Sequence, residues 1–183
     1  MRSDSRARDP MAEYADFFEQ HHRRALRLAY VMCGDNGNAE DIVAESFARM
    51  YPAWQKGQIE DPVAYLRRTI ANLVRGTWRH KEVERRYDAR VKVMWAAETP
   101  GVDDALVARD AVSLALTSLP PKQRAVVALR YLEDLSEAET ASVLDISVGT
   151  VKAHASRGLD RLREVMAGMS DATGPTPTAP DPN

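Results

Sequence analysis

The sequence has little of what a secreted or membrane protein needs. Cys33 is the only cysteine among 183 residues, so no disulfide can form within the chain. The longest unbroken apolar run covers residues 28–33, whereas a membrane-spanning helix needs about 18–20 such residues. The first ten residues are polar and contain no apolar stretch that would serve as a signal peptide. The sequence therefore predicts a protein of the cytoplasm, where thiols stay reduced.

Residues for catalysis or metal binding are also scarce. Two of the four histidines, His21 and His22, are adjacent, so a helix would point them about 100° apart rather than at one metal. His80 and His154 lie in basic surroundings that repel a cation. No glycine-rich phosphate loop, paired cysteines or Ser/His/Asp arrangement is present. We expect no metal, no cofactor and no catalytic activity, and we interpret Cys33 as a small core residue.

Charge is unevenly distributed, although the formal net charge is only −2. Residues 64–92 contain nine Lys and Arg against three Asp and Glu, a balance of +6, and residues 147–163 contain four against one, a balance of +3. Acidic residues are found elsewhere, for example at 40, 41, 45, 60 and 61. This separation predicts a polyanion partner for two local surfaces and a different partner for the acidic one. Taken alone, either basic segment is equally compatible with a solvated helix face.

Apolar residues recur with helical spacing along the chain, and no segment alternates as a strand would. We predict an all-α fold of two small helical domains joined by a flexible linker. The expected domains are residues 12–92 and 104–167, with a linker at 93–103, a flexible N-terminus at 1–11 and a disordered tail at 168–183 that is rich in proline.

Local signals place the individual helices. We expect helices at about 11–33, 39–54, from 62 onward, 104–118 and 121–132. Asn38 is the expected N-cap of the second helix, and Asp61 caps the third, which has proline at its first position. The expected buried stripe of the first helix is Phe18, Ala25, Ala29 and Met32. Trp78, inside the basic segment, is equally compatible with DNA contact and with core packing.

A helix-turn-helix pattern follows near the C-terminus. The sequence SEAE at 136–139 is a capping box that opens a short helix ending near Leu144, and a three-residue turn leads to a basic helix from Val148. In this pattern the second helix enters the DNA major groove. Its packed face has Val151, Ala155, Leu159 and Leu162 within about 80° of one another. The alternative is a capped helix pair that only packs.

The opposite side of that basic helix carries the candidate DNA-binding side chains. Small residues near its start allow close approach to a base pair. Thr150 and Arg157 are suited to base edges, and Lys152 and Arg161 to phosphates. The full candidate set is Thr150, Lys152, Ala153, His154, Ser156, Arg157 and Arg161.

Three segments together resemble a known family. LPPKQRAVVALRYLEDLS at 119–136, continuing through SVGTVK at 147–152 to RGLDRLR at 157–163, is similar to region 4 of the extracytoplasmic-function (ECF) sigma factors of RNA polymerase, in particular the actinobacterial sigma-E-like group. NAEDIVAESF at 38–47 resembles their region 2.2, and DPVAYLRRTIANL at 61–73 resembles their regions 2.3–2.4. The three motifs occur in the family's order and spacing over residues 13–165.

The resemblance implies a transcription initiation factor with three partners: core RNA polymerase, promoter DNA and an anti-sigma factor. It implies that the region 2.2 helix binds polymerase through Asp41, Ile42, Glu45 and Phe47. It implies that the next loop and helix bind the minus-ten promoter element, the loop capturing a flipped base. The residues are Lys56, Gln58, Arg67, Arg68, Asn72, Arg75 and Arg79. The helix from Val148 would read the minus-thirty-five element.

Two departures from the family pattern bear on the second domain. Asp145 stands at a turn position that is commonly glycine, and Asp tolerates the left-handed conformation better than most residues. Ala155 stands where a larger aliphatic residue is common, which thins the packing of the recognition helix. The competing interpretation is a LuxR-type activator, whose DNA-binding domain contains a sequence like GTVKAH at 149–154. The helical, basic first 100 residues do not fit the receiver or sensor domain of such a protein.

Overall fold

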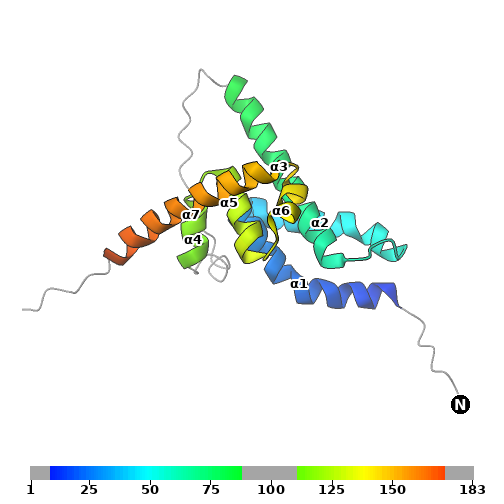
Figure 1. The fold of residues 1–183 in the computed structure, drawn as a ribbon. Coiled ribbons are helices and arrows are strands. Elements are labelled where there is room, and N and C mark those ends of the chain that lie inside the picture. The colour runs from blue at the N-terminus through cyan, green and yellow to red at the C-terminus, as the bar shows by residue number, and fades with distance from the viewer. Residues whose placement is uncertain (1–8, 88–110, 172–183) are drawn as a thin grey trace, which may run out of the picture.

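The computed structural model describes residues 9–87 and 111–171, and within these ranges the chain is helical with no strand. Figure 1 shows the arrangement of the helices. The linker predicted at 93–103 and residues 172–183 of the tail predicted at 168–183 lie outside the described residues, whereas residues 168–171 of that tail are helical rather than disordered. The elements are α1 (Pro10–Cys33), α2 (Asn36–Gln55), α3 (Pro62–Tyr87), α4 (Ala111–Thr117), α5 (Pro121–Val127), a π-helical turn η2 (Ala128–Leu132), α6 (Glu137–Leu144) and α7 (Val148–Asp171).

The first unit consists of α1, α2 and α3, and short polar residues set its helix ends. Asp9 caps α1 by accepting a hydrogen bond from Met11 N at 3.0 Å, and α1 ends where Gly34 takes φ +78°. Asp35 caps α2 by accepting from Asn38 N at 2.7 Å. The prediction that Asn38 is the N-cap was wrong, because the aspartate three residues earlier satisfies the free amide and starts the helix sooner.

Aromatic rings fill the end of the first unit where α1 and α2 cross. Phe17 is 8% exposed and Phe18 is 39% exposed, so the prediction that Phe18 belongs to the buried stripe was wrong. One residue along a helix is a rotation of about 100°, which turns Phe17 into the core and leaves Phe18 at its edge. Phe18 still packs edge-on against Phe47 with ring centroids 4.7 Å apart. Tyr14 donates to Phe47 O at 2.6 Å, and burial raises the pKa of its hydroxyl to about 12.

The second unit consists of α4 to α7. The predicted capping box is confirmed: Ser136 Oγ accepts from Glu139 N at 3.2 Å, and a Glu139 carboxylate oxygen accepts from Ser136 N at 2.8 Å. Asp145 takes φ +53°, the left-handed conformation expected at the end of α6. Gly158 lets α7 approach α5 closely, because a Cβ at this position would lie 2.6 Å from Val127 Cγ2.

The two units also pack directly on each other. Helices α4, α5 and η2 contact α1, and α6 contacts α3 (Figure 1). One apolar cluster runs through both units, from Phe17 in α1 to Val151 in α7. The sequence predicted the two helical units but gave no sign of this shared core. Among the described residues, no helix is both long and apolar enough to cross a membrane.

Candidate nucleic-acid interface

Helix α7 presents most of its predicted DNA-binding side chains to solvent. Lys152, Ser156, Arg157 and Arg161 are exposed, whereas Thr150, Ala153 and His154 are partly buried. On the other side of the helix, Val151 is fully buried and Gly158 lies against α5. The helix thus has one packed face and one open cationic face, which is the division that the hydrophobic spacing predicted.

The N-terminal end of α7 is held by Ser147. Its hydroxyl accepts a hydrogen bond from Thr150 N at 3.1 Å and lies 2.8 Å from Thr150 Oγ1. Lys152 lies next on the exposed side, with its Nζ 3.5 Å from a carboxylate oxygen of Glu137 in α6. Because both side chains are largely in water, this ion pair contributes little and leaves Lys152 available to another anion.

His154 is a titratable side chain on this face, and its pKa differs from the ordinary value. Partial burial lowers the pKa of its imidazole, and the positive charges of Arg157 and Lys122 lower it further. Its Nδ1 is buried without a hydrogen-bond partner in the part of the chain that the structure describes. The imidazole is therefore neutral at neutral pH, and it adds no positive charge to the cationic face.

The small side chain of Ala155 leaves a hollow beside α7. An open cavity of about 310 Å³ lies between η2 and α7, and Ala155 and Leu159 form part of its wall. Arg130, Lys152 and Arg163 are at its rim together with two acidic residues, Glu137 and Asp160. Ala155 and Leu159, which the hydrophobic spacing assigned to the packed face, thus border an open hollow on one side.

Helix α3 carries most of the predicted minus-ten residues. Arg68, Asn72 and Arg75 fall within about 60° of one another on its surface, by the 100° step of an α-helix. Arg68 and Asn72 are exposed. The side chains of Arg67 and Arg75 are only 16% and 23% exposed. For Arg79 the structure describes the helical backbone alone.

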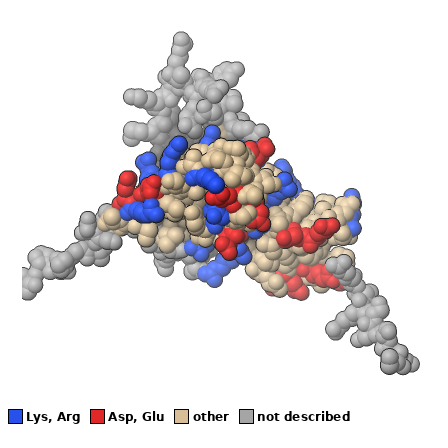
Figure 2. Space-filling view, in the orientation of Figure 1, with Lys and Arg blue, Asp and Glu red and all other residues tan. Residues whose placement is uncertain are grey.

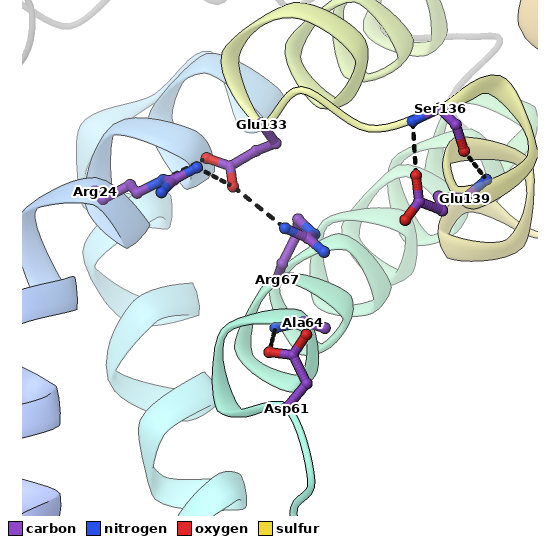
Figure 3. Close-up of polar contacts among 7 residues, drawn as sticks. All are labelled: Arg24, Asp61, Ala64, Arg67, Glu133, Ser136 and Glu139. Carbon is purple, nitrogen blue, oxygen red and sulfur yellow. Dashed lines mark hydrogen bonds and ion pairs between the residues drawn. The ribbon is translucent and has the colours of Figure 1, made fainter.

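The loop before α3 is short and well fixed at both ends. Lys56 and Gln58 are exposed, and Gly57 between them takes φ +62°. Gln58 N donates to Ala53 O at 3.0 Å, which folds the loop back on α2. Asp61 caps α3 as predicted, by accepting from Ala64 N at 3.0 Å (Figure 3).

The predicted polymerase-binding residues of α2 divide into two pairs. Asp41 and Glu45 are exposed one turn apart, and Figure 2 shows acidic side chains gathered at the end of the molecule formed by α1 and α2. Ile42 and Phe47 are 6% and 4% exposed and belong to the core. A partner would therefore touch the carboxylates directly, while the two apolar side chains hold the helix that presents them.

Sequence reasoning missed a set of charged contacts between the two units. Glu133, at the end of η2, accepts hydrogen bonds from Nε and Nη2 of Arg24 in α1, both at 3.1 Å (Figure 3). The same carboxylate lies 3.7 Å from Arg67 Nη1 in α3. Asp145 lies 3.1 Å from Arg75 Nη2. A single sequence has no signal for these pairs, because the partners are separated by 109, 66 and 70 residues along the chain.

Arg124 makes a further contact between the units and is buried. Its Nε and Nη2 donate to Met32 O of α1 at 3.3 and 3.2 Å, and its Nη1 donates to Thr117 O of α4 at 2.9 Å. Burial lowers the pKa of the guanidinium. Gly34 takes φ +78°, a conformation that favours glycine, and a Cβ on it would also lie 2.7 Å from Arg124 Nη1.

The remaining candidates have structural roles. Trp78 is partly buried and packs against the core, which favours core packing over DNA contact for this residue. Burial raises the pKa of the Cys33 thiol, which disfavours the reactive thiolate. Among the described residues, no group of three or more His, Cys, Asp or Glu is arranged to hold a metal ion.

Comparison with known proteins identifies both units. Residues 17–83 match the family of sigma-70 region 2, and residues 109–162 match the family of sigma-70 region 4. The RNA polymerase sigma-E factor of Streptomyces coelicolor is 36% identical over 158 residues, which cover 83% of this chain and 85% of that protein. This chain belongs to the ECF sigma factors of the sigma-70 family. The ECF sigma factor SigW of Bacillus subtilis is 33% identical over 82% of this chain and 87% of its own length.

A solved structure supports the fold of this sigma factor. The sigma factor RpoE of Bartonella quintana, crystallised in complex with the anti-sigma factor NepR, superposes with a TM-score of 0.61 at 23% identity. The superposition covers 83% of this chain and 97% of that one. The LuxR alternative is not favoured, because the first unit is a sigma region 2 and the helix-turn-helix belongs to a sigma region 4.

Proposed function

We propose that this sigma factor binds core RNA polymerase through the acidic face of α2 and selects promoters through α3 and α7. The observation that carries the proposal is the exposed cationic face of α7 within a region 4 unit, together with a second cationic helix, α3, in region 2. Catalysis belongs to the polymerase, and the cytoplasm is the compartment in which the two meet.

The second unit would read the minus-thirty-five element with α7. Arg157 is exposed and can donate two parallel hydrogen bonds to a guanine edge, a contact worth about 1–3 kcal/mol of discrimination. Lys152 and Arg161, at either side, are suited to phosphates, which position the helix but carry no sequence information. Thr150 has its hydroxyl next to Ser147, so its methyl group is the part free to meet a base.

The first unit would bind the minus-ten element with α3 and the loop at 56–61. Stacking one base on a protein side chain is worth about 1–3 kcal/mol, and extruding that base from a duplex costs a few kcal/mol. The two energies nearly cancel, so the isolated chain does not open a promoter. Held at a fixed spacing by polymerase, the two DNA-binding units act at a high effective concentration and become selective.

Polymerase binding is assigned to Asp41 and Glu45. Their carboxylates are exposed on neighbouring turns of α2, and a cationic partner surface would pair with them. Glu45 also accepts from Arg49 Nε at 2.6 Å, which orients the carboxylate. Relatives of known structure include a sigma factor in complex with an anti-sigma factor, and we expect this sigma factor to have such a partner as well.

In vitro transcription with purified core polymerase tests the proposal. With this sigma factor, the enzyme is expected to start at a defined set of sites that share two upstream elements. Asp41→Ala is expected to abolish co-purification with core polymerase, while Asp16→Ala, an exposed aspartate of α1, leaves it unchanged. Equal co-purification of the Asp41 variant would remove the assignment of this surface, and the absence of defined start sites would contradict the function.

A further inference from the structure

Basic side chains from two helices gather where α5 packs on α7 (Figure 1). Lys122 is in the first turn of α5, and His154 and Arg157 are three residues apart on α7, which makes them neighbours on the helix surface. Gly158 lies one turn after His154 on the same face, and a Cβ on it would lie 3.6 Å from Gln123 Cβ of α5. Because Lys122 precedes Gln123, this close approach also brings Lys122 toward His154. We call Lys122, His154 and Arg157 the α5–α7 cluster.

The α5–α7 cluster has no acidic partner in the part of the chain that the structure describes. Lys122 and Arg157 are both exposed, and no carboxylate of the described ranges forms an ion pair with either. On the other side of α7, by contrast, Lys152 is paired with Glu137. Like charges that share a site repel one another, and an anion placed between them removes the repulsion. The cluster therefore has the charge arrangement of an anion site.

The imidazole of His154 supplies a hydrogen-bond donor to this site. Of its two ring nitrogens, only Nδ1 is buried without a partner among the described residues. Buried N–H groups that lack an acceptor are rarer in proteins than buried acceptors that lack a donor, so we assign the proton of the neutral ring to Nε2. Nε2–H can then donate to a phosphate oxygen, while the ammonium of Lys122 pairs with the same phosphate as a point charge.

We propose that Lys122 and His154 bind one phosphate of the DNA backbone beside the minus-thirty-five element, so that α5 belongs to the DNA interface together with α7. The inference rests on the proposed function, which places α7 on that element. Arg157, next to both groups, remains the side chain that reads a base, because phosphate contacts position a helix but carry no sequence information. Gly158 makes the site possible, since a Cβ there would lie 2.6 Å from Val127 Cγ2 and force α5, with Lys122, away from α7.

Replacing single phosphates of the promoter by uncharged methylphosphonates tests the site. The full chain, bound to core polymerase, is assayed for its affinity for promoter duplexes that carry one replacement in or next to the minus-thirty-five element. At one phosphate, the wild type is expected to lose about tenfold in affinity, because a charged hydrogen-bonded contact is lost. Lys122→Ala is expected to bind the unmodified promoter about tenfold more weakly and to change about twofold or less at that phosphate. Arg163→Ala, which removes an exposed charge from the other side of α7, is expected to respond as the wild type does.

The surroundings of His154 give a second readout, the pH dependence of binding. In the free chain, partial burial and the charges of Arg157 and Lys122 hold the pKa of His154 below its ordinary value of 6.5. Helix α4 contributes no charged side chain, and the α6 acids Glu137 and Glu139 are engaged by Lys152 and by Ser136 N. A phosphate beside the ring raises the pKa of the imidazole. Affinity for the promoter therefore increases as pH falls through the pKa of the bound imidazole, and it levels off once the free imidazole is protonated as well.

A pair of histidine variants isolates this proton. His154→Gln cannot take up a proton at this position and is expected to lose the increase in affinity in acid. His22→Gln, at a partly buried histidine of α1, is expected to keep it. An equal response of wild type and Lys122→Ala to every replaced phosphate would overturn the inference, and so would an unchanged pH dependence in His154→Gln.

Inorganic phosphate distinguishes a DNA site from a general anion site. In the free chain, the NMR resonances of the His154 ring are expected to move when a minus-thirty-five duplex is added and to stay in place when inorganic phosphate is added at matched ionic strength. Equal movement with both would overturn the assignment to DNA. If the complex with core polymerase does not prefer the promoter over a duplex with a scrambled minus-thirty-five element, the proposed function itself fails. If it does prefer the promoter and Lys122→Ala behaves as the wild type, only the phosphate site is wrong.

Discussion

Helices α3 and α7 carry similar basic side chains, but those of α7 are exposed to solvent and two of those on α3 are paired with acids. Both are long amphipathic helices with arginines on one face, and both belong to units assigned to promoter DNA. On α7, Arg157 and Arg161 face solvent. On α3, Arg67 and Arg75 are engaged by acids of the other unit. The sequence of a cationic helix therefore indicates which ligand it can bind, whereas tertiary packing determines whether its arginines are exposed to that ligand.

The two helices also differ in how closely neighbouring side chains approach them. Substituting one glycine on each helix by alanine is expected to give the largest difference between them, in the free energy of unfolding. Gly158→Ala is expected to destabilise the protein by about 1–3 kcal/mol, because the new Cβ meets Val127 Cγ2 at 2.6 Å. Gly76→Ala is expected to stabilise it by about 0.5–1 kcal/mol, since no atom lies within 4 Å and alanine is the better helix former. Thermal and urea unfolding measure both changes. If both substitutions changed the free energy of unfolding in the same direction, the packing described for α7 would be contradicted.

Arginine substitutions on the two helices are expected to change the affinity for DNA differently. In the free chain, Arg157→Ala is expected to weaken DNA binding by about 1–3 kcal/mol, whereas Arg67→Ala changes it little because Arg67 is already masked. In complex with core polymerase, both substitutions are expected to reduce promoter binding. Arg163→Ala, an exposed arginine of α7 outside the predicted DNA set, controls for the loss of charge. If Arg67→Ala weakened DNA binding by the free chain as much as Arg157→Ala does, α3 would be accessible to DNA in the free chain, against this prediction.

A smaller effect than those at Gly158 and Arg157 is expected at the start of α6, which places the turn before α7. Ser136→Ala removes the cap and is expected to lower the free energy of unfolding by about 1 kcal/mol. Hydrogen bonds from Ser136 hold the pKa of Glu139 below its ordinary value of 4.5. Because a lowered carboxyl pKa stabilises the fold only while the group is ionised, this contribution is present above pH 4.5 and is lost as pH falls through the folded pKa.

Urea unfolding at several pH values measures this contribution. Glu139→Ala is expected to be less stable than wild type at neutral pH and equal to it in acid below the folded pKa. A difference that persists unchanged into acid would mean that the glutamate acts through packing rather than through its charge.

Local signals in the sequence predicted much of this fold. The capping box at Ser136, the cap at Asp61 and the left-handed Asp145 each depend on a few neighbouring residues, and each is confirmed. Phe18 was assigned to the core wrongly because a single turn of helix offers two adjacent aromatic residues, and only the packing of α2 selects Phe17. On α2, the helical spacing of apolar residues correctly indicates that Ile42 and Phe47 are buried. The family resemblance instead grouped them with Asp41 and Glu45 as polymerase-binding residues, and only the two acids of that group are exposed.

The contacts between the units were beyond sequence reasoning. Glu133 and Arg124 lie within the motif at 119–136, but that motif does not indicate their partners. The partners are Arg24, Arg67 and Met32, which are distant in the chain. The candidate DNA residues of α7 could be chosen from helical geometry, since the packed and open faces alternate regularly. Those of α3 could be chosen in the same way, but their partial burial follows only from the position of the second unit.

Hydroxyl-radical footprinting of one promoter, with the free sigma factor and with the same protein bound to core polymerase, tests the central claim most directly. The account predicts weak protection by the free chain, confined to the minus-thirty-five element that α7 contacts. With polymerase it predicts strong protection of both elements. Tight protection of the minus-ten element by the free chain would contradict it, because α3 would then be accessible without any partner.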